Sequence, residues 1–182
     1  MKIYVARVLF PVTALGPGKR AGIWFTGCDR HCPECISPEL WNMNYGRETE
    51  PEELARFMET HMKNIEGFSI SGGEPFYQSE GLKLLLEHLI KINRDIIIFT
   101  GYTAEELQKS GDPAVRDIMD MASLIVAGPY VPEQNNGMGL RGSSNQEFLI
   151  RGHQYQKDEL EHYKRKLQLF SYGNQYIEIG IP

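Results

Sequence analysis

Hydrophobic residues along the chain follow two spacings in turn, with strand-like apolar runs alternating with stretches that repeat every third or fourth residue. The first spacing predicts β-strands and the second predicts amphipathic helices. Regular alternation of strand and helix predicts parallel strands joined by right-handed crossovers. We predict strands over 2–9, 21–26, 67–71, 95–100 and 123–127, and helices over 51–63, 79–91, 104–110 and 114–121.

The regular pattern ends after Gly128 and Pro129. Residues 133–146 contain glycine, asparagine and serine without an apolar period, which predicts a long functional loop. Residues 158–167 form a charged stretch for which we predict a helix, and residues 169–181 predict a closing hairpin around a Gly173–Asn174 turn. Because no repeat, low-complexity tract or linker interrupts the chain, we expect a single domain over residues 1–182.

Composition narrows the class of protein. The chain has 182 residues, of which 41% are hydrophobic and 24% charged, with a formal net charge of -5. That charge argues against binding of a nucleic-acid polymer through a broad basic surface, and it leaves a small nucleotide-like ligand open. The N-terminal residues contain only short apolar pieces, so we expect no secretory signal, no membrane contact and a cytoplasmic location.

The cysteines are the first chemical signal. The chain has only three, Cys28, Cys32 and Cys35, and they follow directly on the predicted strand 21–26. An odd number of cysteines within eight residues is a poor disulfide framework and a good set of soft metal ligands. Iron-sulfur clusters normally take four cysteine ligands, so three would leave one iron open to a substrate. The alternative is a zinc site completed by His31 or a distant histidine, although His31 adjoins Cys32 and is more easily read as an exposed loop residue.

Two further segments follow predicted strands. Residues 69–75 read Ser-Ile-Ser-Gly-Gly-Glu-Pro, and residues 100–103 read Thr-Gly-Tyr-Thr. Glycines let backbone approach a ligand closely, and parallel α/β sheets bind ligands at the carboxyl ends of their strands. We therefore expect both segments beside the cysteines. A plain tight turn for the glycines, and helix-start packing for Tyr102, are the structural alternatives.

A third candidate segment precedes the cysteine strand. Gly16-Pro17-Gly18 is a stiff turn that delivers the two cations Lys19 and Arg20. This is an arrangement suited to an anion, although surface basic residues of no special role would look the same.

The Cys-x3-Cys-x2-Cys spacing after an apolar strand resembles the signature of the radical S-adenosylmethionine (SAM) enzymes. The resemblance implies a 4Fe-4S cluster on Cys28, Cys32 and Cys35, which would be the catalytic and metal-binding residues. It implies SAM as second cofactor and a partial, open β/α barrel as the fold. Reductive cleavage of SAM would yield a 5′-deoxyadenosyl radical that abstracts a hydrogen atom. The cofactor-binding residues would be Ser37, Ser71, Gly72, Gly73, Glu74, Thr100 and Tyr102.

Within that superfamily, the Gly-Pro-Gly-x-Arg segment resembles the glycyl-radical-enzyme activases. Residues 140–146, Leu-Arg-Gly-Ser-Ser-Asn-Gln, together with Thr100-Gly101-Tyr102, Gly128-Pro129-Tyr130 and the closing Gly180-Ile181-Pro182, resemble the activases of anaerobic ribonucleotide reductase. The resemblance implies a glycyl-radical enzyme as partner, an electron donor such as flavodoxin or ferredoxin, and an anaerobic setting. The substrate residues would be Lys19, Arg20, Arg141 and Asn145.

The chain departs from this pattern at a few positions. Glu34 stands between the last two cysteines where an aromatic residue is common, and 36–39 read Ile-Ser-Pro-Glu instead of His-Asn-Pro-Glu. Leu15 and Ala127 replace expected acidic residues. These changes leave open a radical SAM enzyme, for instance a lyase or epimerase, acting on a small molecule such as a modified nucleobase. A third hypothesis is an electron-transfer or structural metal module without catalysis, against which the 69–75 segment argues.

Overall fold

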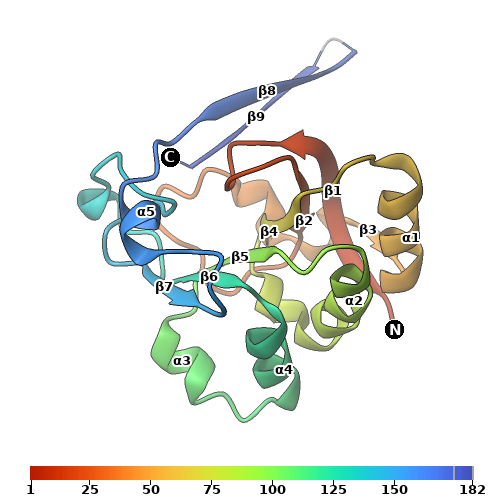
Figure 1. The fold of residues 1–182 in the computed structure, drawn as a ribbon, viewed down its shortest axis with the longest axis horizontal. Coiled ribbons are helices and arrows are strands. Elements are labelled where there is room, and N and C mark those ends of the chain that lie inside the picture. Colours follow the sequence, from red (N-terminus) through yellow and green to blue (C-terminus); the bar gives the residue numbers. More distant parts are fainter. Residues whose placement is uncertain (174, 182) are drawn as a thin grey trace.

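An open mixed sheet forms the centre of the computed structural model, which describes residues 1–173 and 175–181. Its seven strands have the order β3-β1-β2-β4-β5-β6-β7 (Figure 1). The parallel strands are β2 (Arg20–Phe25), β4 (Gly67–Gly72), β5 (Ile96–Thr100) and β6 (Leu124–Ala127). The antiparallel strands are β1 (Ile3–Val12), β3 (Arg47–Thr49) and β7 (Glu147–Ile150). The predicted α/β architecture with parallel strands is confirmed.

The edge strands β3 and β7 are not paired with each other, so within the described residues the sheet does not close into a barrel. Neither of these short edge strands is among the predicted ones. β3 has three residues and no buried side chain, hence no apolar signal. β7 pairs antiparallel with β6, because the chain returns along the sheet edge after the 133–146 loop instead of crossing over through a helix.

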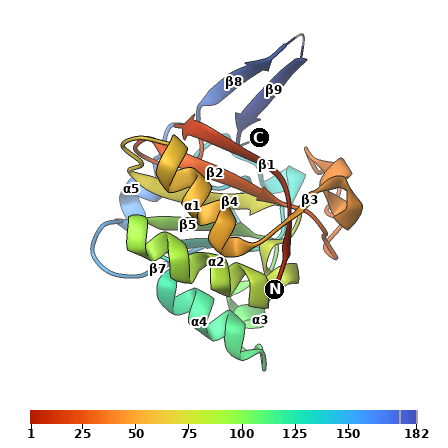
Figure 2. The ribbon, with the colours of Figure 1, turned by 90° about the vertical axis from the view of Figure 1, so that its right-hand side faces the viewer.

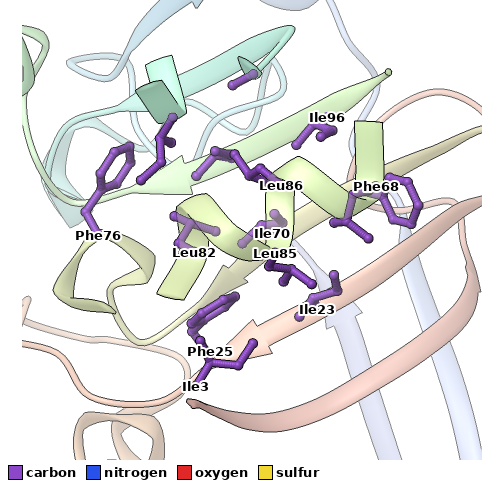
Figure 3. Packing of buried hydrophobic residues seen from close by; sticks show 14 of the residues in the cluster. Ile3, Ile23, Phe25, Phe68, Ile70, Phe76, Leu82, Leu85, Leu86 and Ile96 are labelled. Atoms are coloured by element: carbon purple, nitrogen blue, oxygen red, sulfur yellow. The ribbon is translucent and has the colours of Figure 1, made fainter. Parts of the chain in front are cut away.

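Helices in the crossovers cover one face of the sheet. Their bounds are α1 (Pro51–His61), α2 (Ser79–Ile92), α3 (Ala104–Gln108) and α4 (Pro113–Met121). Figure 2 shows α1, α2 and α4 side by side over the strands. Leu82, Leu85 and Leu89 recur at helical spacing on α2 and are completely buried. All three belong to the same cluster as the strand residues Ile23 and Phe68, and Figure 3 shows Leu82 and Leu85 beside these strands, so the predicted apolar stripe is the core.

The C-terminal part of the chain covers the opposite face. Because side chains alternate along a strand, Ile96 and Ile98 of β5 face the helices while Ile97 belongs to a second cluster on the other side. Leu140 from the long loop, and Leu160, complete that cluster. The elements there are α5 (Lys157–Glu161) and a separate hairpin of β8 (Leu167–Tyr172) and β9 (Gln175–Gly180).

The hairpin prediction is confirmed, with Asn174 of its expected turn, like the terminal Pro182, outside the described residues. The predicted helix over 158–167 is wrong in extent, because α5 ends at Glu161 and Leu167 already begins β8. Packing explains the early end: Leu160 is buried, and the Tyr163 hydroxyl donates to the Thr13 carbonyl at 3.3 Å. Such tertiary contacts outweigh the weak helix preference of a charged stretch.

Short 3-10 helices complete the connections. They are η1 (Pro38–Trp41), η2 (Met43–Tyr45), η3 (Pro75–Gln78) and η4 (Pro132–Gln134). Apart from the end of η4, the 133–146 stretch has no helix or strand, as predicted. In the described part of the chain, no helix is long and apolar enough to cross a membrane.

Candidate functional site

The loop that follows β2 carries three free, partly buried cysteines, Cys28, Cys32 and Cys35. Two of its residues, His31 and Glu34, have φ values of 45° and 54°. This left-handed region is uncommon for residues with a Cβ and marks a tightly folded backbone. All three cysteines line one cavity of about 170 Å³ at the carboxyl ends of the parallel strands.

The donor set suits a multi-iron cluster. Within the described residues, no group of three or more His, Cys, Asp or Glu side chains converges closely enough to hold a metal ion. A cluster does not require such convergence, because each thiolate binds a different iron. The Cys28 sulfur also accepts a hydrogen bond from the Arg30 backbone at 3.4 Å. Burial raises the pKa of the Cys28 thiol, and backbone donors of His31 and Arg30 act in the opposite direction.

The end of β4 forms the next wall of this cavity, through Ser71, Gly72, Gly73 and Glu74. A Cβ on Gly72 would lie 2.3 Å from the Phe25 carbonyl oxygen, and one on Gly73 would lie 2.4 Å from that of Gly27. The two glycines therefore allow β4 to pack against the end of β2 and the start of the cysteine loop. Backbone packing therefore explains the Gly-Gly pair, in addition to the predicted close approach to a ligand.

The Glu74 carboxyl is buried and held by three hydrogen bonds. It is 1% exposed and accepts hydrogen bonds from the Thr100 hydroxyl at 2.8 Å and from the Gly101 and Phe76 backbone at 2.7 and 3.0 Å. Burial raises the pKa of Glu74 to about 7, against the lowering effect of these hydrogen bonds. Near neutral pH the carboxyl can thus carry the negative charge that attracts a ligand ammonium group.

Tyr102 fastens the cysteine loop to the next strand end. Its hydroxyl donates to the Asp29 carboxylate at 2.8 Å, and the Arg30 guanidinium lies 4.0 Å from the centre of its ring. Arg30 also forms an ion pair with Glu106. Burial, together with the Asp29 hydrogen bond, raises the pKa of Tyr102, so the hydroxyl stays protonated and remains a donor. Tyr102 thus holds the loop that carries the cysteines.

The structure adds cavity residues to which the sequence assigns no site role, namely Arg30, Trp41, Phe99, Tyr130 and Gln146. Gln146 joins the long loop to the end of β6. Its amide donates to the Gly128 carbonyl at 2.7 Å and its oxygen accepts from the Gly142 backbone at 2.7 Å. The sequence of residues 140–146 resembles an activase segment, yet nothing in it distinguishes the residue that lines the cavity.

Arg141 and Asn145, predicted to meet the substrate, hold the same loop together. Arg141 donates to the Gln146 carbonyl at 3.0 Å, and Asn145 to the Pro129 carbonyl at 2.8 Å. Nevertheless Nε of Arg141 and Oδ1 of Asn145 are buried with no hydrogen-bond partner in the described chain, as is Nε of Arg30. Buried orphan polar atoms often belong to ligand sites. Both predictions therefore remain predictions.

Lys19 and Arg20 lie at the opposite end of the sheet, where β2 begins. Arg20 is completely buried and donates to both oxygens of Asp95 at 2.9 and 3.0 Å and to the Ser69 hydroxyl at 2.8 Å. Lys19 is exposed beside Glu66, which accepts from its backbone. The structure thus separates both residues from the cysteine cavity and gives Arg20 a structural ion pair.

Two further cavities adjoin the first one. An apolar cavity of about 180 Å³ shares Cys32, Cys35 and Ser71 with it and continues to Ile36 and Gly180. Ser37 lines a third cavity, of about 100 Å³, also next to Cys35. The cysteine loop is therefore the common wall of a continuous open region large enough for more than one ligand.

Comparison with known proteins gives a consistent result. The family described as a 4Fe-4S single cluster domain matches residues 14–149. The anaerobic ribonucleoside-triphosphate reductase-activating protein of Salmonella typhimurium is 30% identical over 147 residues, which cover 75% of this chain and 92% of that protein. That of Vibrio cholerae is 29% identical with the same coverage. The pyruvate formate-lyase-activating enzyme of Clostridium pasteurianum is 35% identical over 111 residues, 57% of this chain and 47% of that protein.

Proposed function

The chain belongs to the 4Fe-4S single cluster family, as a radical SAM enzyme of the activase group, and we propose that it activates an anaerobic ribonucleotide reductase. Its substrate would be a backbone glycine of that partner. The observation that carries the proposal is the cavity shared by the three cysteines and the Ser71–Glu74 segment at the strand ends. The small-molecule alternative is not favoured, because the relatives are named activating proteins.

Cys28, Cys32 and Cys35 are the residues that would hold the cluster. A reduced cluster at these residues would supply the electron for cleavage of SAM to methionine and a 5′-deoxyadenosyl radical, the species that would take a hydrogen atom from the substrate. Residues of the cysteine loop limit the positions that the three thiols can take. The Tyr102–Asp29 hydrogen bond and the Arg30–Glu106 ion pair hold the cysteine loop against β5 and α3, which fixes the thiols relative to the cavity.

The end of β4 would hold the SAM amino group. Its ammonium needs acceptors, which ionised Glu74 and the backbone oxygens of Gly72 and Gly73 can provide. Thr100 keeps the Glu74 carboxyl in place by its hydrogen bond, and Ser71 and Ser37 offer hydroxyls along the cavities. The orphan Nε of Arg30 is a further donor in the same cavity, suited to a carboxylate.

The remaining assignments belong to the same proposal. A one-electron donor protein such as flavodoxin or ferredoxin would reduce the cluster, and Arg141 and Asn145 would serve the substrate site by shaping the loop that carries Gln146 to the cavity. The open sheet would be a partial radical SAM barrel forming one domain over the whole chain. Lys19 and Arg20 would have no direct substrate role, because they lie at the other end of the sheet.

Anaerobic reconstitution tests the proposal. The iron-loaded, reduced protein should convert SAM to 5′-deoxyadenosine, and it should generate a glycyl radical signal by electron paramagnetic resonance when mixed with the reductase of the same organism. The matched control is Cys32→Ala, which removes one cluster ligand. SAM cleavage equal to that of the control would refute the enzymatic assignment, whereas cleavage without a glycyl radical would refute only the partner.

A further inference from the structure

The β8–β9 hairpin is not part of the central sheet. It is a separate two-stranded sheet that projects from the body beside the C-terminus (Figures 1 and 2). The family match ends at residue 149, before α5 and the hairpin begin. The residues that the family match covers therefore give the hairpin no role.

The two faces of the hairpin differ. Ile179 is buried, and Phe170 and Ile177 pack against the second core cluster. Gln168 of the same face donates to the Pro11 carbonyl at 2.7 Å, which fixes the hairpin to the end of β1. The inward face is thus anchored, and the outer face has a defined orientation.

The outer face carries three large apolar side chains, together with the exposed Ser171 and with Glu178 opposite Leu169. Leu167, Leu169 and Tyr176 are 70%, 66% and 75% exposed. Alternation along the strands and the pairing register place all three on the face opposite Phe170 and Ile177. Large exposed apolar side chains grouped on a rigid element are typical of an interaction surface. We call these three residues the hairpin stripe.

The hairpin stripe runs directly into the cavity region. Leu167 pairs with Gly180, and a Cβ on Gly180 would lie 2.6 Å from the Leu167 side chain, so Leu167 covers that glycine. Gly180 in turn lines the apolar cavity with Cys35 and Ile36, and Ile36 is 65% exposed. A polypeptide lying on the stripe would therefore reach the cysteine loop without leaving the apolar surface.

Positive charge borders the base of the stripe. Lys164 and Lys166 are exposed immediately before β8, although the chain as a whole carries a net charge of -5. An apolar surface with a basic border complements a protein surface with an apolar centre and acidic residues at its edge.

The proposed substrate makes such a surface necessary. Glycine has no side chain, so a site that acts on one particular glycine must recognise the surrounding polypeptide. Binding energy from remote parts of a substrate can position the reacting atom. We propose that the hairpin stripe docks the partner enzyme, whose glycine-bearing segment then crosses Gly180 to enter the apolar cavity; this rests on the activase function proposed above.

The double variant Leu169→Ser with Tyr176→Ser tests the inference. Both side chains are exposed on the outer face, so the fold should persist. The matched control is Phe57→Ser, which removes an exposed aromatic residue, 49% exposed, from α1 on the helical side. For each reconstituted protein we would measure 5′-deoxyadenosine formation without partner, affinity for the anaerobic ribonucleotide reductase of the same organism, and the glycyl radical yield.

The hairpin variant should bind the reductase at least tenfold more weakly and need correspondingly more reductase for half-maximal radical formation. Its SAM cleavage without partner should equal that of the wild type and of Phe57→Ser. Unchanged affinity for the reductase would overturn the docking role while leaving the activase function intact. A loss of self-association with unchanged reductase binding would also overturn it, by showing a second copy of the chain as the occupant. Absence of SAM cleavage in the wild type would instead refute the proposed function.

Discussion

The Glu74 carboxyl experiences two opposing influences at the end of β4. Burial favours its neutral form, while three hydrogen-bond donors favour the carboxylate, and the pKa is raised to about 7. A proton is thus bound more tightly in the folded chain than in the unfolded chain. Stability from this source is present below the ordinary pKa of 4.5 and is lost as the pH rises through about 7.

We predict that the free energy of unfolding of the cluster-free protein falls by up to about 3 kcal/mol from this group between about pH 5 and about pH 8. Glu74→Gln should remove this component, because the amide does not titrate. The quantity to compare is the slope with pH in denaturant unfolding, since the amide also changes the local hydrogen bonds. Glu80→Gln, at an exposed acid on α2, serves as control. Parallel slopes in Glu74→Gln and the wild type would contradict the prediction.

Tyr102 supports a second prediction, about access to the cysteines. Tyr102→Phe removes the hydrogen bond to Asp29 and keeps the ring against Arg30. The partly exposed bond contributes at most about 1 kcal/mol, so the protein should remain folded while the cysteine loop opens more often. Thiol labelling of the cluster-free protein should therefore be faster than in the wild type. Tyr77→Phe, which alters an exposed tyrosine, should label at the wild-type rate.

The sequence predicts the role of a residue where a short motif alone determines that role. The spacing of the three cysteines and the Gly-Gly-Glu segment after a strand place them at one cavity because parallel strands end at the same edge. Arg20 could not be assigned in this way. Its partner Asp95 lies 75 positions further along, and a cation after a glycine-rich turn looks the same whether it meets a ligand or a buried carboxylate.

At the scale of elements, the long loop depends on the segment before the hairpin. Arg165 donates to the Asn135 side chain at 2.7 Å and to the Met138 and Gly139 carbonyls at 2.9 and 3.3 Å. Burial lowers the pKa of Arg165, but an arginine keeps its charge near neutral pH. One side chain thereby connects the base of β8 to the loop that carries Gln146 into the cavity.

Arg165→Met should loosen that loop. Each hydrogen bond lost is worth about 1 kcal/mol. A tenfold increase in the equilibrium constant for loop opening corresponds to about 1.4 kcal/mol. Because the variant loses several of these bonds, amide exchange over 139–142 should accelerate roughly tenfold or more. Hydrogen exchange with mass spectrometry measures this directly. Lys164→Met, at an exposed neighbouring cation, should leave the exchange of 139–142 as in the wild type. Equal protection in both variants would show that other contacts hold the loop.

The accuracy of the predicted elements follows from where each one packs. The central strands and α1, α2 and α4 bury a periodic apolar face, so their spacing is visible in the sequence. α5 and β7 are held by contacts distant in sequence: the Leu160 carbonyl accepts a hydrogen bond from the Leu140 backbone N–H, and β7 pairs with β6. A short segment stabilised in this way carries little periodicity of its own.

At the scale of the whole molecule, the two ends of the parallel strands carry different kinds of residues. The carboxyl ends hold the cysteine cavity, whereas the amino ends hold the buried Arg20–Asp95 pair, to which the Tyr155 hydroxyl donates at 2.7 Å. Glu74 and Arg20 are both buried charged groups, but only Glu74 faces a cavity. A buried ion pair thus lies at one end of the sheet, and the candidate chemistry lies at the other.

This division predicts separate effects for the two ends. Asp95→Ala leaves the completely buried Arg20 without its carboxylate, and because Asp95 is 21% exposed the loss of stability should be near the lower end of the usual range, about 3 kcal/mol. Cluster content and SAM affinity per folded molecule should be unchanged, since the cavity lies a full strand length away. Lys19→Met should alter stability by no more than about 0.5 kcal/mol. If Asp95→Ala instead weakened SAM binding while the protein kept its stability, Arg20 would belong to the site, and the amino ends of the strands would have a functional role after all.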